Sequence, residues 1–416
     1  MEQSLSPELR AQTTYRWDLV RGAGQGVIET CWQVFALLVA IRVFQADESI
    51  KQFIPAGLGI GLLLTPIGLS IIHHLDMRIS KVLSYIWLIG AFALAGMAFS
   101  GTIFLFVGFV AVLQILASQG TPLLTHLYSV NYPSNKRGSW LSNTFIVGSL
   151  LAIVFGYVGG KLLDRDVELY PWIFAVGIGA GLLVAFAVGK IPSENTESLK
   201  SGNPLHSMTI AWKDTLYRKM LIGWMLIGMG NLMMIPLRVE YLANPIYGIN
   251  ASNSEITALL ISTVLIFRIL STKVWGILFD RMNVITLRII LNTVFLFSIL
   301  TFFFTSHIWL ITIGCALLGA AFGGGGILWT LYVTKIAPPD KVAAYMSVHS
   351  FLTGTRMALA PFIGYSVIHY THPAMAAWIA MLLICVSNLI FLPLKPLIDA
   401  KAGEIEGMAT QPGGQA

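Results

Sequence analysis

Long apolar runs, separated by short polar turns, dominate this chain. A helix needs about 20 mostly apolar residues to cross a bilayer, and runs of that kind recur from the N-terminal region almost to the C-terminus. We predict membrane-spanning helices at residues 19–43, 50–72, 82–100, 102–128, 139–161, 171–190, 220–242, 255–278, 284–305, 308–333, 342–368 and 374–393. The pattern therefore predicts an all-α membrane protein with twelve transmembrane helices.

One polar stretch is much longer than the other turns and separates six runs from six. Residues 191–218 are rich in proline, serine and charged side chains, which is typical of a linker. We predict an N-terminal six-helix bundle at 1–190 and a C-terminal six-helix bundle at 219–398, with a short amphipathic helix over 205–216 in the linker. Residues 399–416 are polar and predict a disordered tail.

Several residues recur at nearly the same offset in the two halves. Tyr128 recurs as Tyr332, and Pro133 recurs as Pro338, each near the end of the fourth helix of its half. A repeat at half the chain length predicts two pseudo-symmetric six-helix bundles, a plan that places a transport site between parallel halves.

Composition and charge support a membrane location. The chain is 56% hydrophobic and 11% charged, with a mean hydropathy of +0.75, whereas soluble domains carry about 25% charged residues. The net charge is +6, but no block of Lys and Arg suggests a nucleic-acid partner. Most basic residues fall on alternate turns, which predicts that both termini are cytoplasmic. The three cysteines lie far apart in apolar runs and suggest no disulfide framework.

No pattern predicts an enzyme or a bound cofactor. The adjacent pair His73 and His74 lacks further ligands at metal-binding spacing. No Gly-Lys-Ser/Thr phosphate loop and no nucleophile–base constellation is present. We therefore expect no catalytic residues, no metal and no cofactor.

A turn motif carries a family resemblance. Residues 276–281 read Gly-Ile-Leu-Phe-Asp-Arg between two apolar runs, so Gly276, Asp280 and Arg281 match the Gly-x-x-x-Asp-Arg loop signature of the major facilitator superfamily. The first half keeps only Asp76, with Arg78 nearby. The chain thus resembles this superfamily of secondary transporters, which implies a bundle of twelve helices in two halves.

The resemblance also implies a cytoplasmic gate. An Asp at a helix end can pair with Arg or accept from the first amides of a neighbouring helix, and such contacts would form when the halves close on that side. The implied gate residues are Asp76, Arg78, Gly276, Asp280, Arg281 and Arg137, the last from a Pro-x-x-x-Arg-Gly turn. The alternative is that these charges only orient the loops.

Two patterns of drug/proton antiporters in the same superfamily are broken. The fifth helix keeps the paired Gly159 and Gly160 but has Gly156 where those antiporters have proline. The fourth helix has Leu116 where they have arginine. Both departures weaken an interpretation as a drug exporter.

Three ionisable residues lie well inside predicted spans. Glu29, Arg268 and Arg356 would each be costly in lipid, so each should face a cavity or a partner. We predict that Glu29 exchanges a proton, and that Arg268 and Arg356 bind an anionic or strongly hydrogen-bonding substrate. The alternative is a structural ion pair between Glu29 and one of the arginines.

Polar and aromatic residues in the spans supply further candidates. Those expected to contact substrate are Gln25, Gln33, Trp32, Asn231, Trp224, Gln119 and Trp329. Arg42, Arg238 and Glu240 lie at outer helix ends, where they would act as anchors or as an outer gate.

These features predict a secondary transporter that works by alternating access. The leading hypothesis is proton-coupled symport of a small polar metabolite, a sugar or an organic anion. The alternatives are an exporter or antiporter of amphipathic compounds and a non-transporting sensor on the same fold. We expect a monomer in the inner (plasma) membrane whose partners are a small-molecule substrate, protons and the lipid bilayer.

Overall fold

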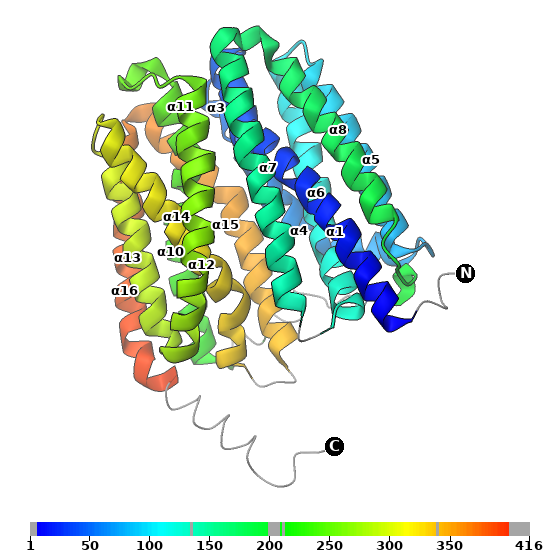
Figure 1. Ribbon diagram of the computed structural model, residues 1–416. Helices are drawn as coiled ribbons and strands as arrows, with labels where there is room; N and C mark the ends of the chain where they lie inside the picture. The colour runs from blue at the N-terminus through cyan, green and yellow to red at the C-terminus, as the bar shows by residue number, and fades with distance from the viewer. Residues whose placement is uncertain (1–5, 134–135, 199–208, 210–212, 338–340, 399–416) are drawn as a thin grey trace. The chain divides into compact units, whose positions relative to one another are not determined.

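The chain folds into long helices. The computed structural model describes residues 6–133, 136–198, 209, 213–337 and 341–398. Before the linker the α-helices are α1 (Pro7–Thr30), α2 (Ala36–Arg42), α3 (Glu48–Lys51), α4 (Phe53–His73), α5 (Ile79–Ala98), α6 (Ile103–Asn131), α7 (Arg137–Arg165) and α8 (Tyr170–Gly189). After it they are α10 (Thr215–Ala243), α11 (Asn253–Thr257), α12 (Val264–Arg281), α13 (Val284–Phe303), α14 (Ile308–Leu331), α15 (Val342–Tyr370) and α16 (Pro373–Phe391) (Figure 1).

Short irregular helices complete the description. Two are π-helical segments inside longer helices, η2 (Cys31–Phe35) and η6 (Ala258–Thr263). The others are 3-10 turns, η3 (Val167–Leu169), η4 (Thr196–Ser198), η5 (Pro245–Tyr247), η7 (Tyr332–Lys335) and η9 (Leu392–Leu394). Among the residues described there is no β-strand, and the isolated bridge there joins Arg78 to Asn195.

Each of the twelve predicted apolar runs overlaps a long helix, and the first and eighth runs cross the π-helical segments η2 and η6. Among the described residues, 11 helices are long and apolar enough to cross a membrane. The exception is α15, a helix of 29 residues. Arg356, His349 and His369 interrupt its apolar sequence and lower its mean hydropathy. Length and hydropathy therefore support an integral, multi-pass membrane protein.

The first helix begins earlier than its apolar run. The Ser6 side chain accepts a hydrogen bond from the Leu9 amide at 3.3 Å, and Pro7 occupies the first helical position. Both features stabilise a helix start. The helix then continues as α1, η2 and α2 from Pro7 to Arg42. The predicted amphipathic helix at 205–216 and the predicted tail at 399–416 lie largely or wholly outside the described residues.

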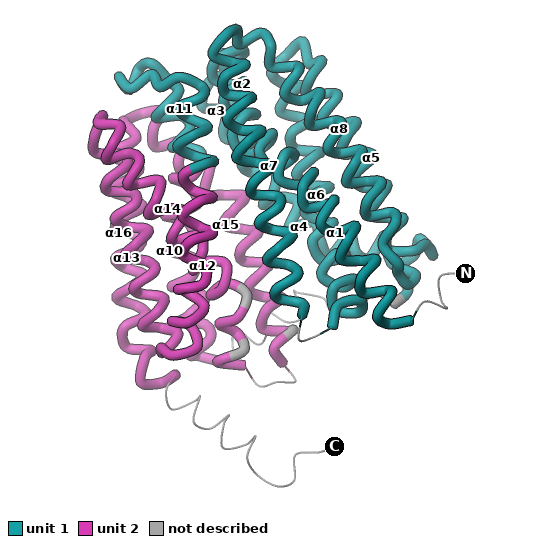
Figure 2. The backbone as a smooth tube through the Cα atoms, viewed as in Figure 1, with its two compact units in different colours: residues 1–201, 236–262 teal, residues 202–235, 263–416 magenta. Residues whose placement is uncertain are grey.

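The chain divides into two compact units (Figure 2). Unit 1 comprises Met1–Ser201 and Pro236–Ser262, and unit 2 comprises Gly202–Ile235 and Thr263–Ala416. In unit 1, α1 packs against α7 and α8, α5 packs against α6 and α8, and α4 packs against α6. In unit 2, α14 packs between α12 and α13, and α16 packs against α13 and α15.

The borders between the units fall at irregular points of two helices. α10 leaves unit 2 at Pro236, which lies inside the helix. The next long helix leaves unit 1 between Ser262 and Thr263, at the end of η6. A proline removes a backbone hydrogen bond and a π-helical turn breaks the regular ladder, so both are points where a helix bends easily. Residues Pro236–Ser262 thus form a helix–loop–helix segment with a weakened helix at each end.

Glycines allow the closest helix contact in unit 1. A Cβ atom added at Gly26 of α1 would lie 2.0 Å from the carbonyl oxygen of Gly148 on α7. A Cβ atom at Gly22 would likewise collide with Thr144 on α7. Small residues spaced by four are typical of tightly packed membrane helices. This contact fixes the rotation of α1 about its axis, and therefore the orientation of the face that carries Gln25 and Glu29.

Candidate functional site

Glu29 is a half-buried carboxylate on α1. Its Oε1 accepts a hydrogen bond from Gln25 Nε2 at 3.1 Å, one turn earlier on the same helix. Within unit 1, no ion pair within 4.0 Å joins Glu29 to a described residue. The carboxylate therefore keeps an oxygen available for a proton or a ligand.

A π-helical turn begins two residues after Glu29. Segment η2 spans Cys31–Phe35 and changes the register of the helix, so Gln33 no longer lies directly above Glu29. Gln33 is exposed and Trp32 is buried. Such turns are found frequently at functional sites, and no pattern in the sequence predicts this one.

Asp18 forms a second polar centre in unit 1. It is fully buried and accepts from Arg21 Nε at 2.6 Å, Tyr128 Oη at 2.7 Å and Thr144 Oγ1 at 2.9 Å. Tyr132 Oη donates to the second oxygen at 3.1 Å. Burial, and then the Asp18 carboxylate, raise the pKa of Tyr132 well above its usual range. The Tyr132 hydroxyl thus stays a donor to the carboxylate, and the network joins α1, α6 and α7.

Arg356 is buried on α15 in unit 2, with 4% of its surface exposed. Its Nη1 donates to the carbonyl oxygen of Trp224 at 2.8 Å, and its Nη2 donates to Thr353 Oγ1 at 2.9 Å. A Cβ atom at Gly228 on α10 would lie 2.2 Å from Arg356 Cδ. Glycine at position 228 therefore makes room for the arginine.

Arg288 is the functional candidate that the sequence analysis missed. The sequence groups it with basic residues flanking a turn, but α13 buries it to 5% exposure. Its Cζ lies 3.9 Å from the ring centroid of Trp224, and Arg356 Cζ lies 5.9 Å from the same ring. A usable signal was present: Arg288 precedes Asn292 and Phe295 by four and seven residues, on the buried face of α13.

His349 completes this group. It is fully buried, and its ring centroid lies 4.9 Å from that of Trp224 and 4.9 Å from that of Tyr332. We call Trp224, Arg288, His349 and Arg356 the Trp224 cluster. All four side chains belong to unit 2 and come from α10, α13 and α15.

The remaining predicted substrate residues differ in their surroundings. Trp329 Nε1 donates to Thr353 Oγ1 at 3.3 Å, beside the Trp224 cluster. Asn231 on α10 is 9% exposed, and its Oδ1 is buried without a hydrogen bond. Arg268 is half-buried on α12. Arg356, which was predicted to act together with Arg268, makes its polar contacts with Trp224 and Thr353. The structure thus does not bring the two predicted arginines into contact.

Gln119 takes part in helix packing. Its Nε2 donates to the carbonyl oxygen of Gly61 on α4 at 3.0 Å and to Ser118 Oγ at 2.9 Å. A Cβ atom at Gly68 would lie 2.2 Å from its Oε1. These contacts hold α4 against α6.

The predicted gate residue Asp76 contacts the start of the linker. Asp76 is exposed with φ 44°, and its Oδ1 accepts from Asn195 Nδ2 at 3.3 Å. The Arg78 backbone pairs with Asn195 in the isolated bridge, and the Thr196 amide donates to the Met77 carbonyl oxygen at 2.9 Å. Residues 191–198 therefore run along the turn between α4 and α5.

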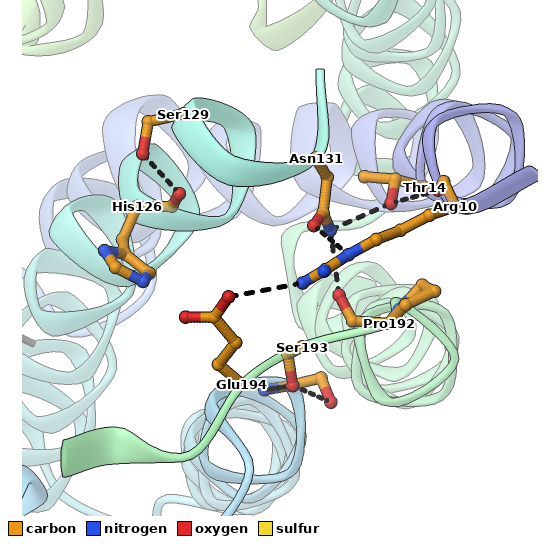
Figure 3. Close-up of polar contacts among 9 residues, drawn as sticks. Arg10, Thr14, His126, Ser129, Asn131, Pro192, Ser193 and Glu194 are labelled. Carbon is orange, nitrogen blue, oxygen red and sulfur yellow. Dashed lines mark hydrogen bonds and ion pairs between the residues drawn. The ribbon is translucent and has the colours of Figure 1, made fainter. Parts of the chain in front are cut away.

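The same linker segment is tied to α1 and α6 (Figure 3). Asn131 Nδ2 donates to the Pro192 carbonyl oxygen at 2.8 Å and to Thr14 Oγ1 at 3.0 Å, while its Oδ1 accepts from Arg10 Nε at 2.7 Å. Arg10 Nη2 also lies 3.8 Å from Glu194 Oε1. The start of the linker is thus part of unit 1.

The other predicted gate residues lie at helix ends. Arg137 Nη2 donates to the Ser129 carbonyl oxygen at 2.9 Å and so caps α6. Asp280 and Arg281 end α12, are exposed, and form no hydrogen bond or ion pair through their side chains with the described residues of unit 2. Space is open beside Gly276, where an added Cβ would come no closer than 4.0 Å to Ile327. Their role as a gate stays a prediction.

Segment Pro236–Ser262 is attached to the rest of unit 1 by polar contacts. Lys51 Nζ lies 2.7 Å from Glu240 Oε1, and Arg42 donates to Asn253 Oδ1 at 2.7 Å and to the Ala251 carbonyl oxygen. A cavity of about 650 Å³ adjoins these contacts and is lined in part by Arg42 and Lys51. Arg238 is also buried in this segment. Arg42 and Glu240, two of the predicted outer anchors, thus form specific polar contacts within unit 1.

No group of three or more potential metal ligands occurs among the residues that the structure describes. His73, one of the two adjacent histidines, has its Nδ1 3.3 Å from the Thr196 carbonyl oxygen.

Three solved transporters have a similar fold. The nucleoside transporter NupG, in a mutant form, superposes with a TM-score of 0.71 at 14% identity, covering 94% of this chain and 99% of that one. A D-xylose-proton symporter gives a TM-score of 0.67 at 15% identity, covering 94% and 98%. A peptide transporter, POT, gives 0.67 at 13% identity, covering 94% of each chain. Identities this low establish the fold alone.

One curated protein is similar in sequence. The Protein TsgA homolog of Buchnera aphidicola subsp. Schizaphis graminum (strain Sg) is 29% identical over 168 residues, which is 39% of this chain and 41% of the relative. The matched region therefore spans about two fifths of that protein.

A family profile matches most of the chain. The profile of the Major Facilitator Superfamily covers residues 23–361, which include every helix from α2 to α14 and most of α15. The predicted resemblance is confirmed, as is the expectation that the protein is a transporter and not an enzyme. The chain belongs to the Major Facilitator Superfamily of secondary transporters.

Proposed function

We propose that this protein is a proton-coupled symporter of a small polar metabolite and that Glu29 is its proton-binding residue. The observation that carries the proposal is the state of this carboxylate: it lies inside an apolar span, contacts Gln25, and has no cationic partner within 4.0 Å among the described residues of unit 1. A carboxyl group in such a position is typical of proton relays in membrane proteins. The fold accommodates this activity, because a D-xylose-proton symporter shares it.

Transport would proceed by alternating access of two six-helix halves, at 1–190 and 219–398, joined by the linker at 191–218. In this proposal α15 also crosses the membrane, which brings the number of spans to twelve, and both termini are cytoplasmic. The basic residues on alternate turns support that orientation. The protein would act as a monomer in the inner (plasma) membrane, with Asp76, Asp280 and Arg281 in a cytoplasmic gate.

The test is substrate-induced proton movement in liposomes that contain the purified protein and a trapped pH dye. The panel is succinate, lactate, D-xylose, D-glucose and uridine at matched ionic strength, with protein-free liposomes as the blank. A symporter acidifies the lumen when its substrate is added. In Glu29→Gln this signal should vanish while exchange of labelled substrate persists, and Glu8→Gln, on the exposed start of α1, should behave as wild type.

Two outcomes would refute the proposal. One is lumen acidification in Glu29→Gln equal to that of wild type. The other is uptake of a panel compound by wild type with no proton movement, which would favour a uniporter or an exporter of another class of compound.

A further inference from the structure

The Trp224 cluster places two cationic side chains on one aromatic ring. Arg288 stacks on the Trp224 indole at 3.9 Å, and Arg356 approaches the same ring at 5.9 Å while donating to the Trp224 carbonyl oxygen. The ring faces attract guanidinium groups, but one indole supplies no net negative charge. The ring therefore orients the two arginines without neutralising them.

Within unit 2, no carboxylate of the residues that the structure describes compensates these charges. The ion pairs among the described residues involve Arg10, Arg21 and Lys51, all in unit 1. The contrast with unit 1 is direct: buried Arg21 is paired with Asp18 at 2.6 Å. Burying a cation without a counter-charge is strongly unfavourable, so two such cations side by side call for an anion.

Several buried polar atoms around the ring have no hydrogen-bond partner. The Nε atoms of Arg288 and Arg356 and both ring nitrogens of His349 are buried without a hydrogen bond. Buried polar atoms are nearly always satisfied in native proteins, and three unsatisfied side chains in one cluster indicate a missing group. Guanidinium donors fit the oxygens of a carboxylate or phosphate especially well.

The arginine positions are built into the packing. Trp224 holds both guanidinium groups, Thr353 accepts from Arg356, and the bare backbone at Gly228 leaves space for its side chain. His349 is enclosed by the rings of Trp224, Trp329 and Tyr332. A site whose side chains are held in place before binding avoids the cost of ordering them.

We infer that the Trp224 cluster binds an organic anion through a carboxylate or phosphate group, with Arg288 and Arg356 as its cationic ligands and His349 as a hydrogen-bonding neighbour. The inference rests on the proposed function in one respect: it names the class of the transported metabolite as anionic and excludes neutral sugars. Arg288 takes the place that the sequence analysis gave to Arg268.

The test is isothermal titration calorimetry on the purified full-length protein in a neutral detergent. Succinate and inorganic phosphate are the anionic probes, and D-xylose and uridine are the neutral probes, all in chloride buffer of fixed ionic strength. Saturable binding of at least one anion and of neither neutral compound is expected. Arg288→Gln and Arg356→Gln should each weaken anion binding at least tenfold, whereas Lys395→Gln, an exposed cation of unit 2, should leave it unchanged.

A second variant keeps the inference testable if the arginine variants fail to fold. Gly228→Ala retains both charges but forces Arg356 to move, so it should weaken anion binding while Gly108→Ala, where an added Cβ meets nothing within 4 Å, should not. Repeating the titration in nanodiscs with and without phosphatidylglycerol separates a soluble anion from a lipid headgroup. The inference would be overturned if only phosphatidylglycerol, and no soluble anion, had an effect. It would also be overturned if all variants bound the anion equally.

This result is separable from that of the proton-movement assay. Anion binding that depends on Arg288 and Arg356, without proton movement in liposomes, would leave the site standing and remove the symport proposal. Proton-coupled uptake of D-xylose without anion binding would remove the anion site and leave the symport proposal standing.

Discussion

Lys51 and Glu240 form an ion pair sealed from solvent, with Lys51 Nζ 2.7 Å from Glu240 Oε1 and side-chain exposures of 2% and 0%. Glu48 lies 3.5 Å from the same ammonium group, and Asn244 Nδ2 donates to the same Glu240 oxygen at 2.8 Å. Glu240 and Asn244 belong to Pro236–Ser262, so the pair fastens this segment to the rest of unit 1.

Removing one partner of this pair should be costly. Lys51→Met leaves the Glu240 carboxylate buried without its cation, which is expected to destabilise the protein by about 3–5 kcal/mol. The double variant Lys51→Met/Glu240→Leu should recover much of that loss, because neither member of the pair is left as a buried charge without its partner. Thermal unfolding of the purified variants, arranged as a double-mutant cycle, measures this. Additive single effects would show that the pair is not coupled.

The close approach of α1 and α7 predicts an effect of a single methyl group. Gly26→Ala places a Cβ atom against the Gly148 carbonyl oxygen, so the helices must separate, at a cost of roughly 1–3 kcal/mol. The variant should show a lower melting temperature by fluorescence-detected size-exclusion chromatography, with Gly108→Ala as the matched control. Equal melting temperatures for the two variants would contradict this packing.

The Asp18 network predicts that charge, and not only shape, is required at this position. Asp18→Asn is nearly isosteric but leaves Arg21 without its anion and gives Tyr128 a poorer acceptor. We expect a loss of roughly 3 kcal/mol or more. Asp47→Asn, at an exposed position, should change stability little. Chemical unfolding followed by tryptophan fluorescence compares the two, and similar midpoints would argue against the network.

The positions of the helices were readable from the sequence because bilayer-length apolar runs have few alternative structures. The positions of charges within them were not. Asp18 and Arg288 lie one to three turns inside their helices. Because the apolar pattern does not define the ends of these helices sharply, both residues resemble charges in loops. Glu29 stood out because apolar residues surround it on both sides.

The partners of a buried charge depend on helix rotation and tilt, which a single sequence does not encode locally. Arg356 was identifiable as a buried cation, but its neighbour proved to be Arg288 rather than Arg268. The π-helical turn η2 and the path of residues 191–198 along unit 1 likewise depend on tertiary contacts. The types of buried polar residue are therefore easier to predict from a single sequence than the partners of those residues.

The most direct test of the account is the accumulation ratio of a transported compound under an imposed pH gradient. Liposomes containing the protein are clamped at zero membrane potential with the outside one pH unit more acidic, and labelled succinate, or the panel compound that shows exchange, is followed to steady state. One proton per substrate predicts roughly tenfold accumulation by wild type, since one pH unit corresponds to about 1.4 kcal/mol. Glu29→Gln should equilibrate at a ratio of about one at this driving force, with exchange intact. Accumulation by Glu29→Gln equal to that of wild type would contradict the central claim.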